Sequence, residues 1–309
     1  TLTMPAASAI LMVRPAAFGF NEETALNNYF QSASSTDAAT LQQKALQEFD
    51  NMVATLRSHN IEVLVIDDSP LPPKPSAIFP NNWLSTSTDG KLCVFPMCAP
   101  NRRDEKRDEI IKQLTADYIV KEFQDWSEYE ADGRYLEGTG SMIIDHDHQM
   151  IYAAISERTN IAVLEKFASA NGYQAIAFIA TDAQGRPIYH TNVMMALGQN
   201  FCVLCEEAIE EERELIAVRQ LLETAGHSII PISRVQMNAF AGNMLEVKNK
   251  AGENILIMSE AAFQSLSEAQ KTQLEKFSNL LPIGVPTIEA TEGGSVRCMM
   301  AEIFLERRG

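Results

Sequence analysis

The chain has 309 residues, 46% of them hydrophobic and 21% charged, which is typical of a folded globular protein rather than a disordered one. Its 41 acidic and 25 basic residues give a net charge of −16, which disfavours nucleic acid and anionic membranes as partners. The sequence contains no run of 18 apolar residues, so we expect no membrane-spanning segment. The five cysteines cannot all pair, and no basic segment precedes the first apolar stretch, so we expect a cytoplasmic protein with free thiols.

Short apolar and β-branched runs predict strands, and longer amphipathic runs predict helices. The predicted strands are 9–13, 62–67, 91–97, 141–145, 150–155, 174–180, 193–198, 201–205, 228–232, 244–247, 254–258 and 299–305. The predicted helices are 36–60, 104–115, 159–171, 207–226 and 260–279. The first helix has Thr36 or Asp37 as its N-cap candidate. Its expected apolar face consists of Leu41, Ala45, Leu46, Phe49, Met52 and Leu56.

The order of these elements predicts a repeating architecture. A strand, a tight link, a second strand, a helix and a third strand follow one another at about 82–123, and the pattern recurs at 141–180, 193–233 and 244–288. The first unit (9–67) is one strand short, and the last strand has no partner in its own unit. We therefore predict a single domain, residues 1–309, in which the C-terminal strand completes the first of five ββαβ units around an axis. An ordinary α/β fold with a mixed sheet is the alternative.

Four loops that precede strands carry residue types suited to catalysis. Cys298 follows two glycines in EGGSVRCMM, where a thiolate could attack a substrate, although a lone cysteine is often only a small buried hydrophobe. His190 heads a core strand in PIYHTNVMM and is a candidate general acid or base. Glu137 in YLEGTGSMIID and Asn81 and Asn82 in FPNNWLSTS hold the equivalent positions in other units. The ring would direct all of them toward one central site.

The remaining histidines and cysteines are not expected to bind metal. We expect solvated side chains for the four other histidines, two of them at helix ends and two in the turn IDHDHQ: His59, His227, His146 and His148. Cys202 and Cys205 form a C-x-x-C inside an apolar strand, where their sulfurs would face opposite sides, so zinc is not expected there even with Cys93 and Cys98 nearby.

These motifs resemble those of the guanidino-group-modifying enzymes, which include arginine deiminases, dimethylarginine dimethylaminohydrolases, agmatine deiminases and amidinotransferases. GGSVRCMM, YHTNVMM, YLEGTGSMI and FPNNW are similar to their cysteine, histidine, acidic and N-terminal motifs, in the family's order over the whole chain. The resemblance implies the pentein fold, a five-bladed α/β propeller with a central active site. It also implies that Cys298 is the nucleophile, His190 the general acid/base and Glu137 the carboxylate that holds a substrate nitrogen.

Two further spans resemble dimethylarginine hydrolase segments that hold the amino-acid end of the substrate. They are APNRRDEKR and SERTN, and they suggest Arg158 together with Arg102 or Arg103 as partners of the substrate carboxylate. Each of these arginines could instead be a solvated surface charge.

The departures from the family pattern concern the acids that hold a cationic guanidinium. Asn82, Asn192 and Gly140 stand where the family has acids, which leaves Glu137. An amide both donates and accepts hydrogen bonds, so it suits a neutral ureido group. The sequence accordingly resembles the citrulline ureidases, often described only as amidinotransferase-like.

We expect a hydrolase of a non-peptide C–N bond, with citrulline giving ornithine, carbon dioxide and ammonia through a thiocarbamate on Cys298. Arginine deiminase or dimethylarginine dimethylaminohydrolase activity, an amidinotransferase, and a non-catalytic pentein binding protein are the alternatives. No metal or organic cofactor is expected. The expected partners are a small amino-acid substrate and, in a homo-oligomer, further copies of the chain, with no nucleic acid or membrane.

Overall fold

The computed structural model describes residues 6–309. The first five residues of the predicted domain lie outside the described residues. The strands are β1 (Ala9–Arg14), β2 (Glu62–Asp67), β3 (Leu84–Thr86), β4 (Lys91–Val94), β5 (Glu122–Asp125), β6 (Ile143–Asp145), β7 (Met150–Ala154), β8 (Gln174–Phe178), β9 (Met195–Leu197), β10 (Phe201–Leu204), β11 (Ser228–Pro231), β12 (Leu245–Lys248), β13 (Asn254–Ser259), β14 (Asn279–Ile283) and β15 (Ala301–Ile303).

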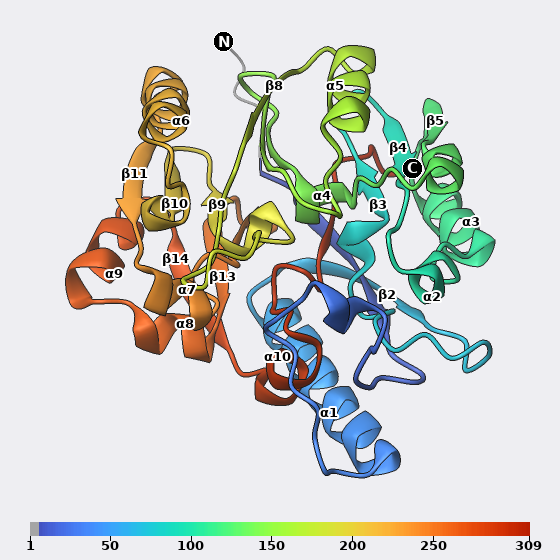
Figure 1. Ribbon diagram of the computed structural model, residues 1–309. Coiled ribbons are helices and arrows are strands. Elements are labelled where there is room, and N and C mark those ends of the chain that lie inside the picture. The colour runs from blue at the N-terminus through green and yellow to red at the C-terminus, as the bar shows by residue number, and fades with distance from the viewer. Residues whose placement is uncertain (1–5) are drawn as a thin grey trace.

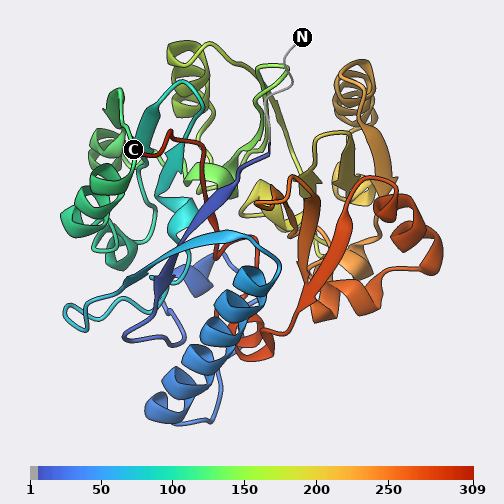
Figure 2. The same ribbon diagram turned by 180° about the vertical axis from the view of Figure 1, so that it is seen from behind.

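The helices lie mostly between the second and third strands of each unit. They are α1 (Ala38–Ser58), α2 (Pro100–Arg103), α3 (Asp108–Asp117), α4 (Gly138–Ser141), α5 (Ile161–Ala170), α6 (Glu212–Thr224), α7 (Arg234–Asn238), α8 (Glu260–Ser265), α9 (Glu268–Glu275) and α10 (Pro286–Glu292). Figures 1 and 2 show the larger helices, such as α1, α3, α5 and α6, on the outside of the molecule, with the strands between them and the centre.

The strands form five three-stranded sheets with one shared pattern. In each sheet a middle strand pairs antiparallel with one neighbour and parallel with the other, as β4 does with β3 and β5. Four sheets use consecutive strands: β3–β4–β5, β6–β7–β8, β9–β10–β11 and β12–β13–β14. These are the second to fifth units, and they confirm the predicted ββαβ repeat.

The first unit is completed from the other end of the chain. Strand β1 pairs in parallel with β2, with Ala9 opposite Glu62, and antiparallel with β15, with Ala9 opposite Ile303. The C-terminal strand therefore occupies the position that the first strand occupies in the other units, as predicted. The antiparallel strands β15, β3, β6, β9 and β12 pack against neighbours from adjacent units and surround the centre of the ring.

Helix α1 matches the predicted amphipathic helix closely. Asp37 is its N-cap and accepts a hydrogen bond from the backbone N–H of Thr40, which satisfies a donor that the helix itself leaves unpaired. Its buried face contains five of the six predicted residues, but Val53 is buried and Leu46 is only half-buried.

The predicted helix 260–279 is wrong as a single element. Leu266 has an extended backbone, and Ser267 starts a new helix through a capping box with Gln270. The segment therefore forms α8 and α9, and β14 already begins at Asn279.

No helix within residues 6–309 is both long enough and apolar enough to cross a membrane.

Candidate active site

The loops that lead into the first strands of the units meet at the centre of the ring. Three of them make one helical turn before the strand, at η2 (Pro80–Asn82), α4 and η4 (Thr191–Val193), and these turns pack against one another. The loops of all five units bring polar side chains to this region: Asn82, Glu137, His190 with Asn192, Asn243 and Cys298. The same place in each repeat thus supplies a different functional group.

The sulfur of Cys298 is buried and faces two amide groups. The Nδ2 atoms of Asn192 and Asn243 lie 3.4 and 3.3 Å from it. Asn243 is held in turn, because it donates to the backbone carbonyl of Asn192 (2.9 Å) and accepts from the N–H of Arg297 (3.1 Å). Two N–H donors directed at one sulfur can stabilise a negative charge on it.

His190 and Glu137 form a buried pair. The Nε2 atom of His190 lies 2.7 Å from Glu137 Oε1, and Glu137 Oε2 accepts the backbone N–H of Cys98 at 2.9 Å. Both oxygens of Glu137 therefore have partners. A Cβ atom at Gly140 would lie 2.5 Å from Asn82 Nδ2 and 2.9 Å from His190 Nδ1, so an acid at this position would collide with both residues.

Burial and charge act in opposite directions on this pair. Burial alone would raise the pKa of Glu137, but the charge of Arg158 and the contact with His190 outweigh it and lower the pKa to about 2. Burial lowers the pKa of His190 to about 4, although the hydrogen bond and charge of Glu137 oppose it. At neutral pH the pair is therefore a carboxylate and a neutral imidazole that is able to accept a proton.

Arg102 fixes the orientation of Asn82. Its Nε and Nη2 atoms both bond Glu105 at 2.9 Å, and its Nη1 donates to Asn82 Oδ1 at 2.8 Å. Because arginine can only donate, the oxygen of Asn82 must face Arg102 and its NH₂ group must point elsewhere. One hydrogen of that NH₂ reaches Asn81 Oδ1 at 3.1 Å.

Arg103 does not line the cavity around Cys298 and instead donates hydrogen bonds to the backbone carbonyls of Met97 and Cys98. Of the two neighbouring arginines, Arg102 is therefore the one that faces the site.

Arg158 connects the site to the N-terminal loop. Its guanidinium donates to Asn27 Oδ1 (2.7 Å from Nε) and to the backbone carbonyl of Thr24 (3.0 Å from Nη2), and it lies over the ring of Tyr189 at 4.7 Å. Its Nη1 atom is 3.6 Å from Glu137 Oε1, which is an ion pair but not a hydrogen bond. Nη1 is therefore the part of Arg158 that remains available to a ligand.

Glu292 is a functional candidate that the sequence reasoning missed. Its Oε2 accepts the hydroxyl of Ser76 at 2.8 Å, whereas its buried Oε1 has no hydrogen-bond partner among the described residues. Burial raises the pKa of this carboxyl group well above its usual range. The position of Glu292 in EGGSVRC, directly before the two glycines, could have indicated that it lies near Cys298. The equivalence of the five loops could likewise have indicated Asn243.

These groups line a small cavity. Its functional lining includes Asn82, Arg102, Arg158, His190, Glu292 and Cys298. Among the described lining residues Glu292 is the only acid, facing two arginines. Three other predicted residues do not line the cavity but contact residues that do. Asn81 contacts Asn82, Asn192 contacts Cys298, and Glu137 contacts His190.

The expectation that His227 is solvated is wrong. It is buried, and its Nε2 lies 2.7 Å from Asp145 Oδ2, because the loop after α6 returns toward β6. His146 is half-buried against the rings of Tyr173 and Phe304, while His59 and His148 are exposed as expected. All five cysteines are free.

The family model described as "N,N dimethylarginine dimethylhydrolase, eukaryotic" matches residues 14–305. A search of curated protein sequences gives no match. Among solved structures, a substrate-bound mutant of the N-terminal domain of ArgZ, an arginine dihydrolase from Cyanobacteria, is 14% identical with a TM-score of 0.73. The match covers 96% of this chain and 98% of that one.

Two further structures show the same fold. A mutant of AgrE in a binary complex with L-arginine is 14% identical with a TM-score of 0.73, and the match covers 97% of this chain but 40% of that one. A mutant dimethylarginine dimethylaminohydrolase, as its adduct with S-methyl-L-thiocitrulline, is 15% identical with a TM-score of 0.67, over 96% of this chain and 100% of that one. The fold is therefore the pentein propeller that the sequence predicted.

Proposed function

This chain belongs to the N,N-dimethylarginine dimethylhydrolase family, and on that premise we propose that it hydrolyses the ureido group of citrulline. As a member of that family it is a hydrolase of carbon–nitrogen bonds other than peptide bonds. The products would be ornithine, carbon dioxide and ammonia. Cys298 would supply the covalent chemistry, so the reaction requires no metal or organic cofactor.

In the first step the Cys298 sulfur attacks the ureido carbon. Neutral His190 accepts the thiol proton, and Glu137 stabilises the resulting imidazolium. The amide groups of Asn192 and Asn243 hold the sulfur while it carries negative charge. His190 then gives the proton to the leaving nitrogen, the C–N bond breaks, and ammonia departs from an N-alkyl thiocarbamate.

In the second step water replaces the sulfur. His190 removes a proton from the water as its oxygen attacks the thiocarbamate carbon, and that proton returns to Cys298 as the C–S bond breaks. The released carbamic acid decomposes to carbon dioxide and ornithine, so the atoms of citrulline and one water are accounted for. An amine in place of water would make the same site a transferase.

The orientation of Asn82 is the observation that carries the choice of a ureido substrate. Because Arg102 occupies Asn82 Oδ1, the group that Asn82 can offer the cavity is an N–H. A ureido oxygen accepts such a hydrogen bond, whereas a guanidinium has only N–H groups at this end. A guanidinium would also be a third cation beside Arg102 and Arg158.

The charges of the cavity also suit the zwitterionic end of an amino acid. The unpaired Oε1 of Glu292 can accept an α-ammonium group, and Nη1 of Arg158 can donate to an α-carboxylate. A zwitterion adds one charge of each sign, so the buried charges remain balanced.

Arginine or a methylated arginine is the second candidate, favoured by the family and by the arginine dihydrolase ArgZ among the similar structures. Glu292 is the acid such a guanidinium would have to use. The deciding experiment measures ammonia, dimethylamine, citrulline and ornithine after incubation with citrulline, arginine or dimethylarginine side by side. A kcat/KM for citrulline at least about 100-fold above that for arginine supports the proposal, since an unbalanced buried cation costs several kcal/mol. A preference for arginine contradicts it.

A further inference from the structure

A second polar cluster lies at the other end of the ring from Cys298. Asp145 is the last residue of β6, whereas the residues around Cys298 precede the first strands of their units. Its Oδ2 atom lies 2.7 Å from His227 Nε2 and 2.9 Å from His148 Nδ1. His148 belongs to the turn after β6, and His227 lies between α6 and β11, so the cluster joins the third and fourth units.

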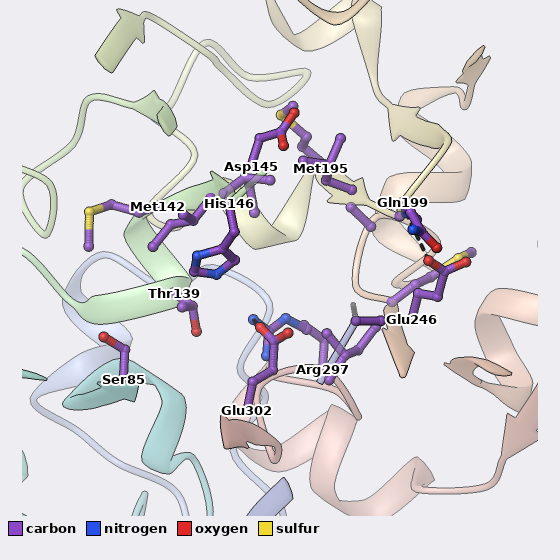
Figure 3. A pocket seen from close by; sticks show the side chains of 18 of the residues that line it. Ser85, Thr139, Met142, Asp145, His146, Met195, Gln199, Glu246, Arg297 and Glu302 are labelled. Atoms are coloured by element: carbon purple, nitrogen blue, oxygen red, sulfur yellow. Dashed lines mark hydrogen bonds and ion pairs between the residues drawn. The ribbon is translucent and has the colours of Figure 1, made fainter. Parts of the chain in front are cut away.

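The cluster is buried on one side and accessible on the other. The side chains of Asp145 and His227 are 4% and 2% exposed, and that of His148 is 44% exposed. Asp145 and His227 also line a cavity that opens to solvent. Figure 3 looks into this cavity and shows Asp145 across it from Arg297 and Glu302. A small ion in solution can therefore reach the three side chains.

One nitrogen of the buried ring has no partner. His227 Nδ1 is buried and makes no hydrogen bond with any described residue, while Nε2 faces Asp145. If Nε2 gave its lone pair to a metal ion, the ring would carry its proton on Nδ1, and no existing hydrogen bond would be lost there. Nε2, which faces Asp145, is therefore the ring nitrogen of His227 that is placed to bind a metal ion.

We propose that Asp145, His148 and His227 form a binding site for a divalent transition-metal ion, with zinc as the ion that fits best. Two imidazole nitrogens and one carboxylate oxygen, all within 4.8 Å of one another, form a typical zinc ligand set, and the cavity can supply water as the fourth ligand. Magnesium and calcium prefer sites made of oxygen atoms alone.

The distances between the ligand atoms are compatible with a bound ion. Zinc binds nitrogen and oxygen at about 2.0–2.2 Å, which places tetrahedral ligand atoms about 3.3 Å apart. The two contacts of Asp145 measure 2.7 and 2.9 Å, so these atoms need to separate by only about half an ångström. The exposed turn that carries His148 can make this adjustment. A bound ion would connect two neighbouring units at the face away from Cys298.

The test measures zinc binding directly and is therefore independent of the catalytic proposal. Metal-free protein with Cys298→Ser, which removes the thiol of the proposed active site, is titrated with Zn²⁺ by calorimetry. We expect one equivalent to bind, and His148→Ala to weaken binding at least about 100-fold, because loss of a ligand should exceed the effect of losing an outer partner. His146→Ala, in the same turn but bonded to Tyr173, is the matched control and should bind zinc like the parent.

Cobalt distinguishes this site from the remaining cysteines. Co²⁺ in a nitrogen and oxygen site gives visible absorption bands without the near-ultraviolet band of a cobalt–thiolate bond. Bound zinc should also raise the thermal midpoint of the parent but not of the His148→Ala protein. The proposal is overturned if no zinc binds, if His148→Ala binds as well as the parent, or if bound cobalt shows the thiolate band.

Discussion

Replacing Asn82 with aspartate tests whether an amide N–H selects the substrate. The exchange keeps the size of the side chain, and the new carboxylate can still accept the hydrogen bond of Arg102 at 2.8 Å. What disappears is the NH₂ group, and with it the donor to Asn81 and the proposed donor to the ureido oxygen. The substrate oxygen would then face a carboxylate oxygen inside the cavity.

The magnitude follows from one lost buried hydrogen bond. Leaving a buried acceptor unsatisfied costs about 2–3 kcal/mol, which corresponds to a loss of about 30- to 150-fold in kcat/KM for citrulline. Arginine should be affected in the opposite direction, because a carboxylate attracts its guanidinium. The ratio of kcat/KM for citrulline to that for arginine should therefore fall by a larger factor than kcat/KM for citrulline alone.

The assay is ammonia release with both substrates, for the parent and for Asn82→Asp. Asn200→Asp, the same exchange at an exposed position in a turn, is the control and should leave both values within about twofold, as is usual for a surface change. If the folded Asn82→Asp protein keeps citrulline activity within about threefold of the parent, Asn82 neither donates to the ureido oxygen nor sets the choice of substrate.

Four further predictions address the other groups of the site. Cys298→Ser should abolish turnover without unfolding the protein, because a serine alkoxide forms far less readily than a thiolate; a folded variant with near-parent rates would refute the nucleophile. Arg158→Ala should raise KM for citrulline about tenfold or more, and an equal effect on the decarboxylated analogue would exclude carboxylate binding. Glu292→Gln should raise KM for citrulline about tenfold but spare 5-ureidopentanoate, which lacks the α-amino group; equal effects would argue against an ammonium contact. The folded protein holds the pKa of His190 at about 4, below the 6.5 of an unfolded histidine. The contribution of His190 to the free energy of unfolding is therefore fully present above pH 6.5. It is lost, up to about 3 kcal/mol, as the pH falls toward 4. Urea unfolding at pH 7 and pH 5 should show a smaller loss for His190→Gln than for the parent, and identical losses would contradict this reasoning.

Local chemistry determined the repeat and the positions of the main candidates. Apolar runs, turn residues and helical spacing depend on neighbours in the sequence, so they predicted the ββαβ order and a helix at 36–60, where the structure has α1 (Ala38–Ser58). The unpaired C-terminal strand predicted the closure through β15. Because equivalent loops of a ring point to one centre, Cys298, His190 and Glu137 could be assigned to one site, and they do lie together.

The tertiary structure decided how the polar groups are paired. Whether an amide presents its oxygen or its NH₂ depends on a partner distant in sequence, as with Asn82 and Arg102. The burial of Glu292 and His227 likewise depends on contacts with Ser76 and Asp145, which lie 216 and 82 residues away. The sequence by itself therefore determined the fold and which residue types reach its centre. Only the packing of distant loops decided which donors, acceptors and charges remain free for a ligand, because hydrogen bonding and desolvation are set by neighbours in space.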